Sequence, residues 1–396
     1  QPPLASPSPS HSLYGVWDGH GGIEAAEFAS DAVPRQLARH PALARPWIGT
    51  GAESEAAGAV TIESAGGGDG CAERGEERGE ESGKAEAEGV PGALARVLRA
   101  VDDAFLEVAQ REAHRSGTTL LCALHRGREL LVLNLGDSRA VLARAPLALP
   151  AAPSGRALRR EPPLEAVRLS CDHTPELPEE RGRVLQSGGD TAVRRISGAW
   201  RVVAYVDELL GRRFDAAAAA AADSAAATSA AASAPASSAA ATAPASLLAA
   251  APLALAIPPV SAAVVACAAA SSRRGGACGS GAAAGAAAGA APSGRPMLLS
   301  VTRALGDLAF KTPRRLVSCV PHVHARTLEE RDRFLILASD GLWDVLSDAE
   351  AVQLASDALQ LARPGTPPAQ RAADALLSRA QKLGTTDNTT VLVVVL

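Results

Sequence analysis

The stretch FLILASDGLWDVLSDAEAV, residues 334–352, places a strand, an acidic turn and a helix start in direct succession. The apolar run over residues 333–338 predicts a buried strand. It leads into Asp340-Gly341, a dipeptide typical of turns. Ser347 and Glu350 then have the spacing of a capping box, which predicts a helix from this point. A carboxylate therefore stands where a buried strand ends.

The same setting, an aspartate between an apolar strand and a glycine-containing or polar turn, occurs at four more places. The five residues are Asp18 in VWDGHGG, Asp137 in NLGDSR, Asp307 in RALGD, Asp340 in ASDGLWD and Asp387 in TTDNTTV. Several carboxylates that meet at one point suit Mg²⁺ or Mn²⁺ better than zinc. Each aspartate taken alone is better interpreted as a turn residue, because Asp-Gly is common in ordinary hairpins.

Metal-bound carboxylates of this kind favour hydrolysis by an activated water. Two ions a few Å apart lower the pKa of a water and hold a phosphoryl oxygen. His20 follows Asp18 by two residues. Its ordinary pKa of about 6.5 suits the protonation of a leaving alcohol.

The remaining periodicities predict an α+β domain of short antiparallel strands with helices kept apart from them. A turn dipeptide or tripeptide separates the runs at 118–124, 129–135 and 138–143, which indicates an antiparallel meander. Further strands are expected at 13–17, 298–302, 333–338 and 389–396, and helices from Glu24, over 93–114 and 177–186, after Ser347 and from Thr366-Pro367.

Two segments of the 396 residues are too biased to form a core. Residues 49–91 are glycine-rich and acidic, and about half of residues 215–294 are alanine, with Ser, Gly, Pro and Thr making up most of the rest. We expect a disordered tail over residues 1–12 and one domain over 13–396 that these two insertions interrupt.

Charge and cysteine content exclude several classes. The formal net charge is −4 and no basic block stands out, so nucleic-acid binding is not expected. The six cysteines contain no C-x-x-C pair, which argues against zinc and disulfide frameworks and for a reducing compartment. Residues 246–270 are uncharged, but three prolines interrupt them, so no membrane span is expected. An intracellular location, cytosolic or organellar, is therefore expected, and because the chain lacks an initiator Met and looks truncated, a targeting peptide would not be visible in it.

Three further patterns have ordinary structural interpretations. Residues 118–119, two threonines, are expected to pack or hydrogen-bond within the meander. Asp172 and His173 are interpreted as a capped turn before a helix. His322 and His324 have the spacing of two metal ligands on one strand face, but nothing in the sequence supplies the other ligands, and a solvated strand is the better interpretation.

Seven motifs together resemble the metal-dependent serine/threonine protein phosphatases of the PPM family (type 2C). The resemblance covers nearly every segment with secondary-structure signals. It implies a central sandwich of two antiparallel sheets flanked by helices, with a dinuclear Mn²⁺ or Mg²⁺ site at one end. The motifs are YGVWDGHGG at 14–22, SGTTLLCAL at 116–124, LLVLNLGDSRAVL at 130–142, DHTPELPEERGRVLQSGG at 172–189, LSVTRALGDLAFK at 299–311, FLILASDGLWDVLSDAEAV at 334–352 and TDNTTVLVVV at 386–395.

The resemblance also implies roles for the acidic residues. Asp18 matches the carboxylate that bridges both metals, and the carbonyl of Gly19 matches a ligand of one of them. Asp340 and Asp387 match the other carboxylate ligands. Asp137 and Asp344 resemble the positions that help to hold a weaker third metal. His20 matches the general acid.

Members of the family usually carry two strands before the DGHGG turn, with an arginine that contacts phosphate and an acidic pair that contributes to the metal site. The residues before Leu13 do not match these strands. The expected function is hydrolysis of phosphoserine and phosphothreonine in protein substrates by a monomer. The alternative is a catalytically impaired fragment or a pseudophosphatase that binds phosphoproteins. Retention of Asp18, His20, Asp340 and Asp387 favours the enzyme.

Overall fold

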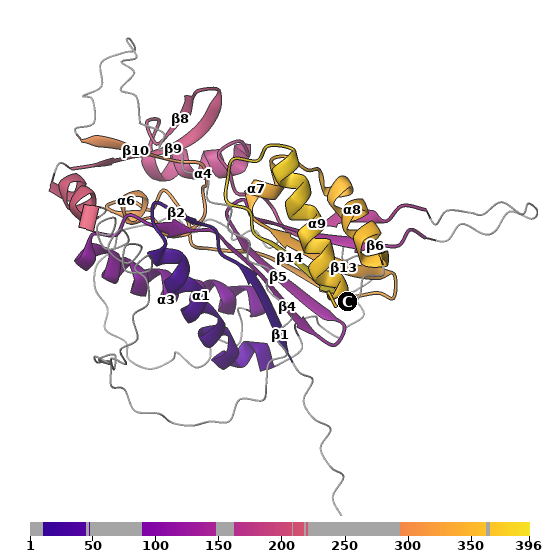
Figure 1. Ribbon diagram of the computed structural model, residues 1–396. Helices are drawn as coiled ribbons and strands as arrows, with labels where there is room; N and C mark the ends of the chain where they lie inside the picture. The colour runs from indigo at the N-terminus through magenta and orange to yellow at the C-terminus, as the bar shows by residue number, and fades with distance from the viewer. Residues whose placement is uncertain are drawn as a thin grey trace, which may run out of the picture.

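The fold is a four-layer arrangement in which two sheets lie between two pairs of helices (Figure 1). The computed structural model describes residues 11–44, 47, 89–147, 162–207, 209–217, 219–220, 294–361 and 365–396. Residues 1–10, the segment 246–270, and most of the two expected insertions lie outside the described residues.

The first sheet contains four antiparallel strands in the order β1-β4-β5-β12. Side chains alternate between its two faces. Leu121 and Ala123 point to the second sheet, whereas Leu120 and Cys122 point to a layer of helices. The strands are β1 (Ser12–Val16), β4 (Leu120–Arg126), β5 (Glu129–Leu135) and β12 (His322–Thr327).

The second sheet has the order β14-β13-β6-β7 and is also antiparallel. Its inner face, with Leu142, Leu335 and Leu337, completes the core of the sandwich with Val16 and Leu121 of the first sheet. The strands are β6 (Arg139–Arg144), β7 (Glu165–Arg168), β13 (Asp332–Ala338) and β14 (Val391–Val395).

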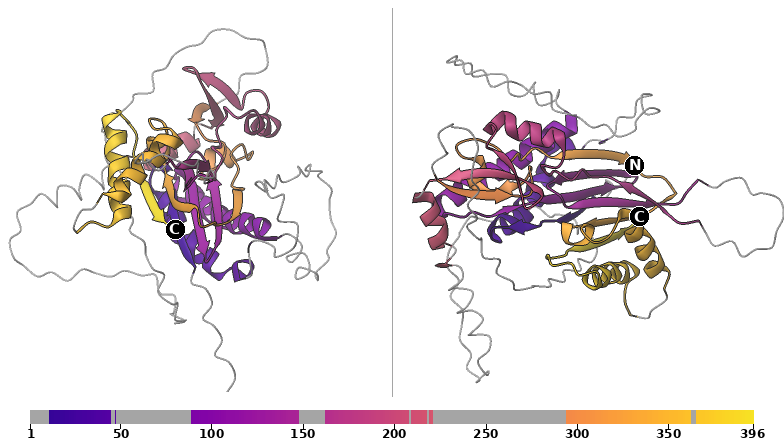
Figure 2. Two further views of the ribbon diagram at one scale, coloured as in Figure 1. Left: turned by 90° about the vertical axis from the view of Figure 1, so that its right-hand side faces the viewer. Right: turned by 90° about the horizontal axis from the view of Figure 1, so that it is seen from above.

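Two helices cover the outer face of each sheet, as the views in Figures 1 and 2 show. Helices α1 (Glu24–Arg39) and α3 (Gly89–Glu112) pack on the first sheet through Leu37, Leu94 and Leu98. The short helix η1 (Pro41–Ala44) follows α1. Val352 and Leu376 bring α8 (Asp348–Gln360) and α9 (Pro368–Lys382) onto the second. This confirms the expected α+β class with a central antiparallel sandwich flanked by helices.

Two smaller sheets lie at the end of the sandwich where β1 and β5 finish. One has the order β11-β3-β2 and the other β10-β9-β8. The second packs with the short helices α4 and α6, whereas the short helix α7 packs with α8 and α9. Their bounds are β2 (Gly19–His20), β3 (Gly117–Thr118), β8 (Val193–Ile196), β9 (Ala199–Val206), β10 (Arg295–Leu299), β11 (Leu305–Gly306), α4 (Pro178–Gly188), α6 (Leu308–Lys311) and α7 (Asp340–Trp343).

Three local predictions are wrong. The third run of the expected meander, β6, leaves the first sheet and pairs with β13 in the second. The strand expected at 298–302 lies earlier in the chain, because β10 covers Arg295–Leu299, and most of its residues are exposed. The last helix begins one residue later than expected, because Pro367 is its N-cap. The capping box of Ser347 and Glu350 is confirmed.

No helix within the described ranges is long and apolar enough to cross a membrane.

Candidate active site

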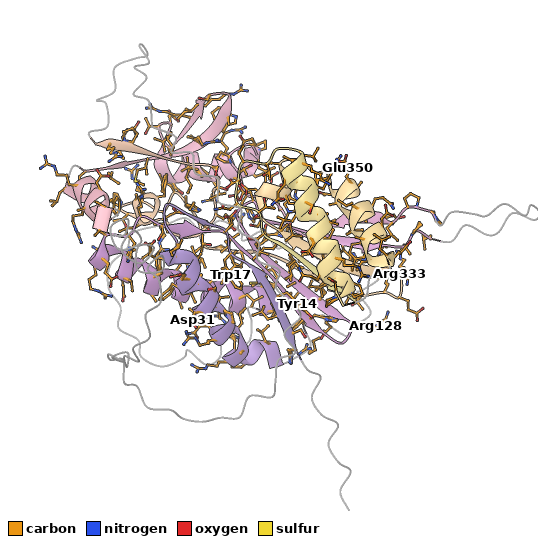
Figure 3. The ribbon with its side chains drawn as sticks, viewed as in Figure 1. Tyr14, Trp17, Asp31, Arg128, Arg333 and Glu350 are labelled. Carbon is orange, nitrogen blue, oxygen red and sulfur yellow. The ribbon has the colours of Figure 1, made fainter. Side chains whose placement is uncertain are left out.

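The candidate carboxylates gather at one end of the sandwich. Strands β1, β5 and β13 run toward this end and β14 starts from it, since Ala338 is paired with Val391. In Figure 3, Arg128 in the β4–β5 turn lies at one end of the first sheet, and Trp17, which precedes Asp18, lies at the other end. Asp18, Asp137, Asp340 and Asp387 follow or precede these strand ends, so the topology brings them together.

Two threonines hold the backbone of Asp18. The carbonyl of Asp18 accepts hydrogen bonds from the Thr119 amide at 2.9 Å and the Thr118 hydroxyl at 3.1 Å. Thr119 Oγ1 also accepts from the Asp18 amide at 3.3 Å and lies 2.9 Å from Ser138 Oγ. These threonines therefore connect the turn of Asp18 to the turn of Asp137. Packing or hydrogen bonding within the run 118–143 was expected of them, whereas their contact with the turn of Asp18 was not.

A glycine brings the turns of Asp340 and Asp387 into contact. A Cβ on Gly341 would lie 2.6 Å from the carbonyl oxygen of Asn388, so only glycine fits here without displacement. Ser339 ties the same two turns, because its amide donates to the Thr390 carbonyl at 3.1 Å and its hydroxyl donates to the Asn388 carbonyl at 3.3 Å.

The carboxyl groups influence one another strongly. Burial, the charge of Asp340 and the contact between the two carboxyl groups raise the pKa of Asp18 to about 8, with smaller contributions from Asp387 and Asp137. Burial and the charge of Asp340 raise the pKa of Asp137 to about 7. The pKa of Asp340 is raised by burial and by Asp387 and Asp344, and that of Asp344 by burial and Asp387. The pKa values of Asp137 and Asp344 stay raised although the charges of His20 and Arg139, respectively, act in the opposite direction.

This donor set fits divalent cations. All five side chains are carboxylates, the hard oxygen ligands that Mn²⁺ and Mg²⁺ take. Oδ1 of Asp340 is buried and has no hydrogen-bond partner among the described residues, as expected of an oxygen that binds an ion. Gly19 lies in β2 opposite Thr118, next to Asp18. In the arrangement seen here, no three His, Cys, Asp or Glu side chains of the described part of the chain converge closely enough to chelate an ion.

His20 lies in β2, two residues beyond Asp18, and its ring is held by Asp307. Nε2 of His20 lies 2.9 Å from both carboxylate oxygens of Asp307. Burial lowers the pKa of His20, but the charge and hydrogen bond of Asp307 raise it above the ordinary value overall. The sequence did not indicate this contact, because it joins two segments far apart in the chain.

A cleft of about 550 Å³ lies at the start of α8, between Arg139, Arg168 and residues 343–349. Arg139 donates to Asp172 and to Asp348, and Arg168 donates to the same two carboxylates. Asp344 lies on the rim of the cleft. The interpretation of Asp172 as a helix-capping turn residue is wrong, since α4 begins six positions later and Asp172 forms ion pairs with both arginines.

The other histidine candidates are His173, whose amide donates to the Gly136 carbonyl at 2.9 Å, and the pair on β12. His173 is buried, and its ring lies 6.3 Å from that of His322. In the part of the chain that the structure describes, Nδ1 of each ring has no hydrogen-bond partner. His322 and His324 lie on β12, as expected, but they are half-buried rather than solvated. Burial and the charge of Arg303 lower the pKa of His173 to about 3, so this residue is a neutral core side chain.

Comparison with known proteins identifies similar sequences and folds. The family model described as "Protein phosphatase 2C" matches residues 76–206 and 280–389. "Probable protein phosphatase 2C 59" of Oryza sativa is 23% identical over 96% of this chain and 65% of its own length. "Protein phosphatase 2C homolog 1" of Saccharomyces cerevisiae is 43% identical over 25% of this chain and 31% of its length. The chain thus spans less than two thirds of either relative.

Among solved structures, the crystal structure of serine-threonine phosphatase 2C from Toxoplasma gondii has a TM-score of 0.55 at 19% identity, over 100% of this chain and 87% of that one. The structure of a C. elegans sex determining protein has a TM-score of 0.52 at 15% identity, over 97% of this chain and 56% of that one. At these identities the likeness concerns the fold.

Proposed function

The chain belongs to the protein phosphatase 2C family, and on this premise we propose that it is a Mn²⁺- or Mg²⁺-dependent phosphatase of phosphoserine and phosphothreonine in proteins. The observation that supports this most is the gathering of mutually repelling carboxyl groups at one end of the sandwich. Asp18, Asp340, Asp387 and Asp137 come from four separate segments. A fold gains no stability from such a cluster, so a cation is its best explanation.

Asp18, Asp340 and Asp387 would hold two ions, together with the carbonyl of Gly19, and Asp137 and Asp344 would contribute to a weaker third site. When bound, such ions supply a water of lowered pKa and neutralise the oxygens of a phosphoryl group. The chain's own contribution is to hold the carboxylates on strand ends. The contacts of Thr118 and Thr119 with Asp18 fix one of them before any ion binds.

His20 supplies the proton in this proposal. An alkoxide of serine or threonine is a poor leaving group unless it is protonated as the ester bond breaks. The pKa of His20, raised by Asp307, keeps the imidazole protonated over a wider pH range than a free histidine. The side chain is 30% exposed, so a substrate oxygen can reach it.

The experiment that tests this is phosphate release from a phosphothreonine peptide by the purified chain, with Mn²⁺ and with EDTA. Activity should require Mn²⁺ and fall at least about 10²-fold in Asp340→Asn. Asp374→Asn, which removes an exposed carboxylate of α9, is the matched control and should keep full activity. Activity that persists in EDTA, or in Asp340→Asn, would contradict the proposal. No activity in the wild type would favour the non-catalytic alternative.

A further inference from the structure

His20 and Asp307 meet across a strand that has no side chain in the way. In the small sheet β11-β3-β2, His20 pairs with Gly117, and Gly117 pairs with Gly306. Asp307 follows Gly306 and sends its carboxylate over Gly117 to reach Nε2 of His20. A Cβ on Gly117 would lie 2.2 Å from Oδ2 of Asp307. The contact therefore exists only because the middle strand carries a glycine at this position.

The backbone around Asp307 is held in an unusual conformation by several contacts. Asp307 has φ 57° and ψ 51°, a left-handed conformation that non-glycine residues seldom adopt. Its amide donates to the Ser116 carbonyl at 3.0 Å, and its carbonyl accepts from the Phe310 amide at 2.8 Å. The side chain is only 2% exposed. A strained, buried aspartate aimed at a partly exposed histidine is typical of a side chain that fixes a reacting group.

The contact with Asp307 uses only one nitrogen of the His20 ring. Nε2 is the nitrogen that donates to the carboxylate, and Nδ1 has no hydrogen-bond partner among the residues that the structure describes. The carboxylate thus selects the ring orientation and the position of one N–H. In a histidine that donates a proton to substrate, the other nitrogen is then the donor.

We propose that Asp307 is a positioning residue that holds His20 by Nε2, so that the proton for the leaving group comes from Nδ1. The inference rests on the proposed phosphatase function. In the step, the P–O bond to the serine or threonine oxygen breaks and its electron pair stays on that oxygen. The Nδ1–H bond breaks and an O–H bond forms on the leaving oxygen. Phosphorus bonds to the oxygen of a water, one of whose protons stays on that oxygen while the other goes to solvent. The ring ends neutral, with Nε2–H still donated to Asp307.

The kinetic test compares two substrates that differ in their need for this proton. A phosphothreonine peptide has an alkoxide leaving group, whereas p-nitrophenyl phosphate releases a stable anion. Asp307→Ala should lower kcat for the peptide by about 10²-fold and for p-nitrophenyl phosphate by less than about threefold. Gly117→Ala leaves Asp307 in the chain but displaces its carboxylate, and should show the same selective loss. Asp103→Ala, on the exposed side of α3, is the control and should change neither rate.

An equal loss for both substrates in Asp307→Ala and in Gly117→Ala would overturn the proposal, because it would indicate a structural role. A second test needs no activity. In the metal-free protein, ¹⁵N NMR of the His20 ring, assigned by its disappearance in His20→Gln, should show protonated Nε2 in the wild type and mixed tautomers in Asp307→Ala. Identical ring spectra in both would contradict the proposal. An inactive wild type would contradict the phosphatase function, and the NMR result would still decide this inference.

Discussion

Nζ of Lys311 lies 2.7 Å from Oδ1 of Asp102, and both side chains are completely buried. Asp102 on α3 also accepts from the Gly306 amide at 2.8 Å. This buried pair therefore anchors the turn that carries Asp307 to the helix layer. The turn beside the candidate active site is held from behind by an ion pair that no solvent screens.

Removing the lysine should destabilise the protein strongly. Lys311→Met keeps most of the side-chain volume but leaves the carboxylate of Asp102 buried without its cation, at a cost of about 3–5 kcal/mol in the free energy of unfolding. Urea unfolding followed by circular dichroism measures this. Lys382→Met, at the exposed end of α9, is the control and should change little. A loss below about 1 kcal/mol in Lys311→Met would show that Arg315, 3.7 Å from Asp102, replaces the lysine.

The neutral His173 should make stability depend on pH. Its pKa is about 3 in the folded protein and about 6.5 when unfolded, so the unfolded chain binds an extra proton between these values. Its contribution to stability is therefore fully present above pH 6.5 and declines by about 1.4 kcal/mol per pH unit below it.

The measurement is unfolding in urea at pH 7 and pH 5, in EDTA, for the wild type and His173→Gln. Because the carboxyls of Asp18 and Asp137 have raised pKa values, they oppose this trend, and the comparison with the variant isolates His173. The wild type should lose more stability between the two pH values than the variant. Equal losses would mean that His173 accepts a proton without penalty in the folded state.

Gly341 should control metal binding although it carries no ligand group. In Gly341→Ala the new methyl group would meet the carbonyl of Asn388 and displace the turn of Asp387. We expect Mn²⁺ affinity to fall at least about tenfold, the effect typical of losing a group that orients a ligand. Isothermal titration measures it. Gly182→Ala in α4, where a Cβ meets nothing within 4 Å, is the control and should bind Mn²⁺ normally. Normal affinity in Gly341→Ala would contradict this packing argument.

Much of the segment between β9 and β10 should be dispensable. Val206 at the end of β9 lies opposite Arg295 at the start of β10, so the fold needs only a short connection there. Phe214 is buried in the core beside these strands and should be kept. Deletion of residues 221–292 should leave turnover within about threefold, since loop closure depends only weakly on length. Phe214→Ala in the same background should cost about 3–5 kcal/mol of stability. A collapse of turnover in the deletion alone would refute this account of the segment.

The sequence predicted the strands well and their sheet membership less well. The apolar runs of β4, β5 and β13 predict buried strands, whichever strands they pair with. The Gly136-Asp137 turn looks like a hairpin, but Asn134 Nδ2 donates to the Ser138 carbonyl at 2.9 Å across it, and the chain then crosses to the second sheet. Such a crossing is decided by long-range pairing with β13, which no local pattern encodes.

In the candidate site too, the sequence predicted the participating residues better than the contacts between them. The resemblance of the DGHGG, SDG and TDN motifs predicted that Asp18, Asp340 and Asp387 serve one function, and the structure gathers them at one end of the sandwich. The contact of His20 with Asp307 was not predicted, because it requires the register of three short strands and a glycine in the middle one. Motifs indicate which residues take part, whereas the contacts between them depend on packing.

The central claim is that Asp18, Asp340 and Asp387 form a divalent-cation site, and Mn²⁺ binding tests it most directly. Electron paramagnetic resonance of free Mn²⁺ in a titration of the wild type should show tight uptake of about two ions per chain, the number that a two-metal site holds. Asp340→Asn and Asp387→Asn should each reduce this uptake, and Asp374→Asn should not. Uptake that is absent in the wild type, or unchanged in both site variants, would contradict the account.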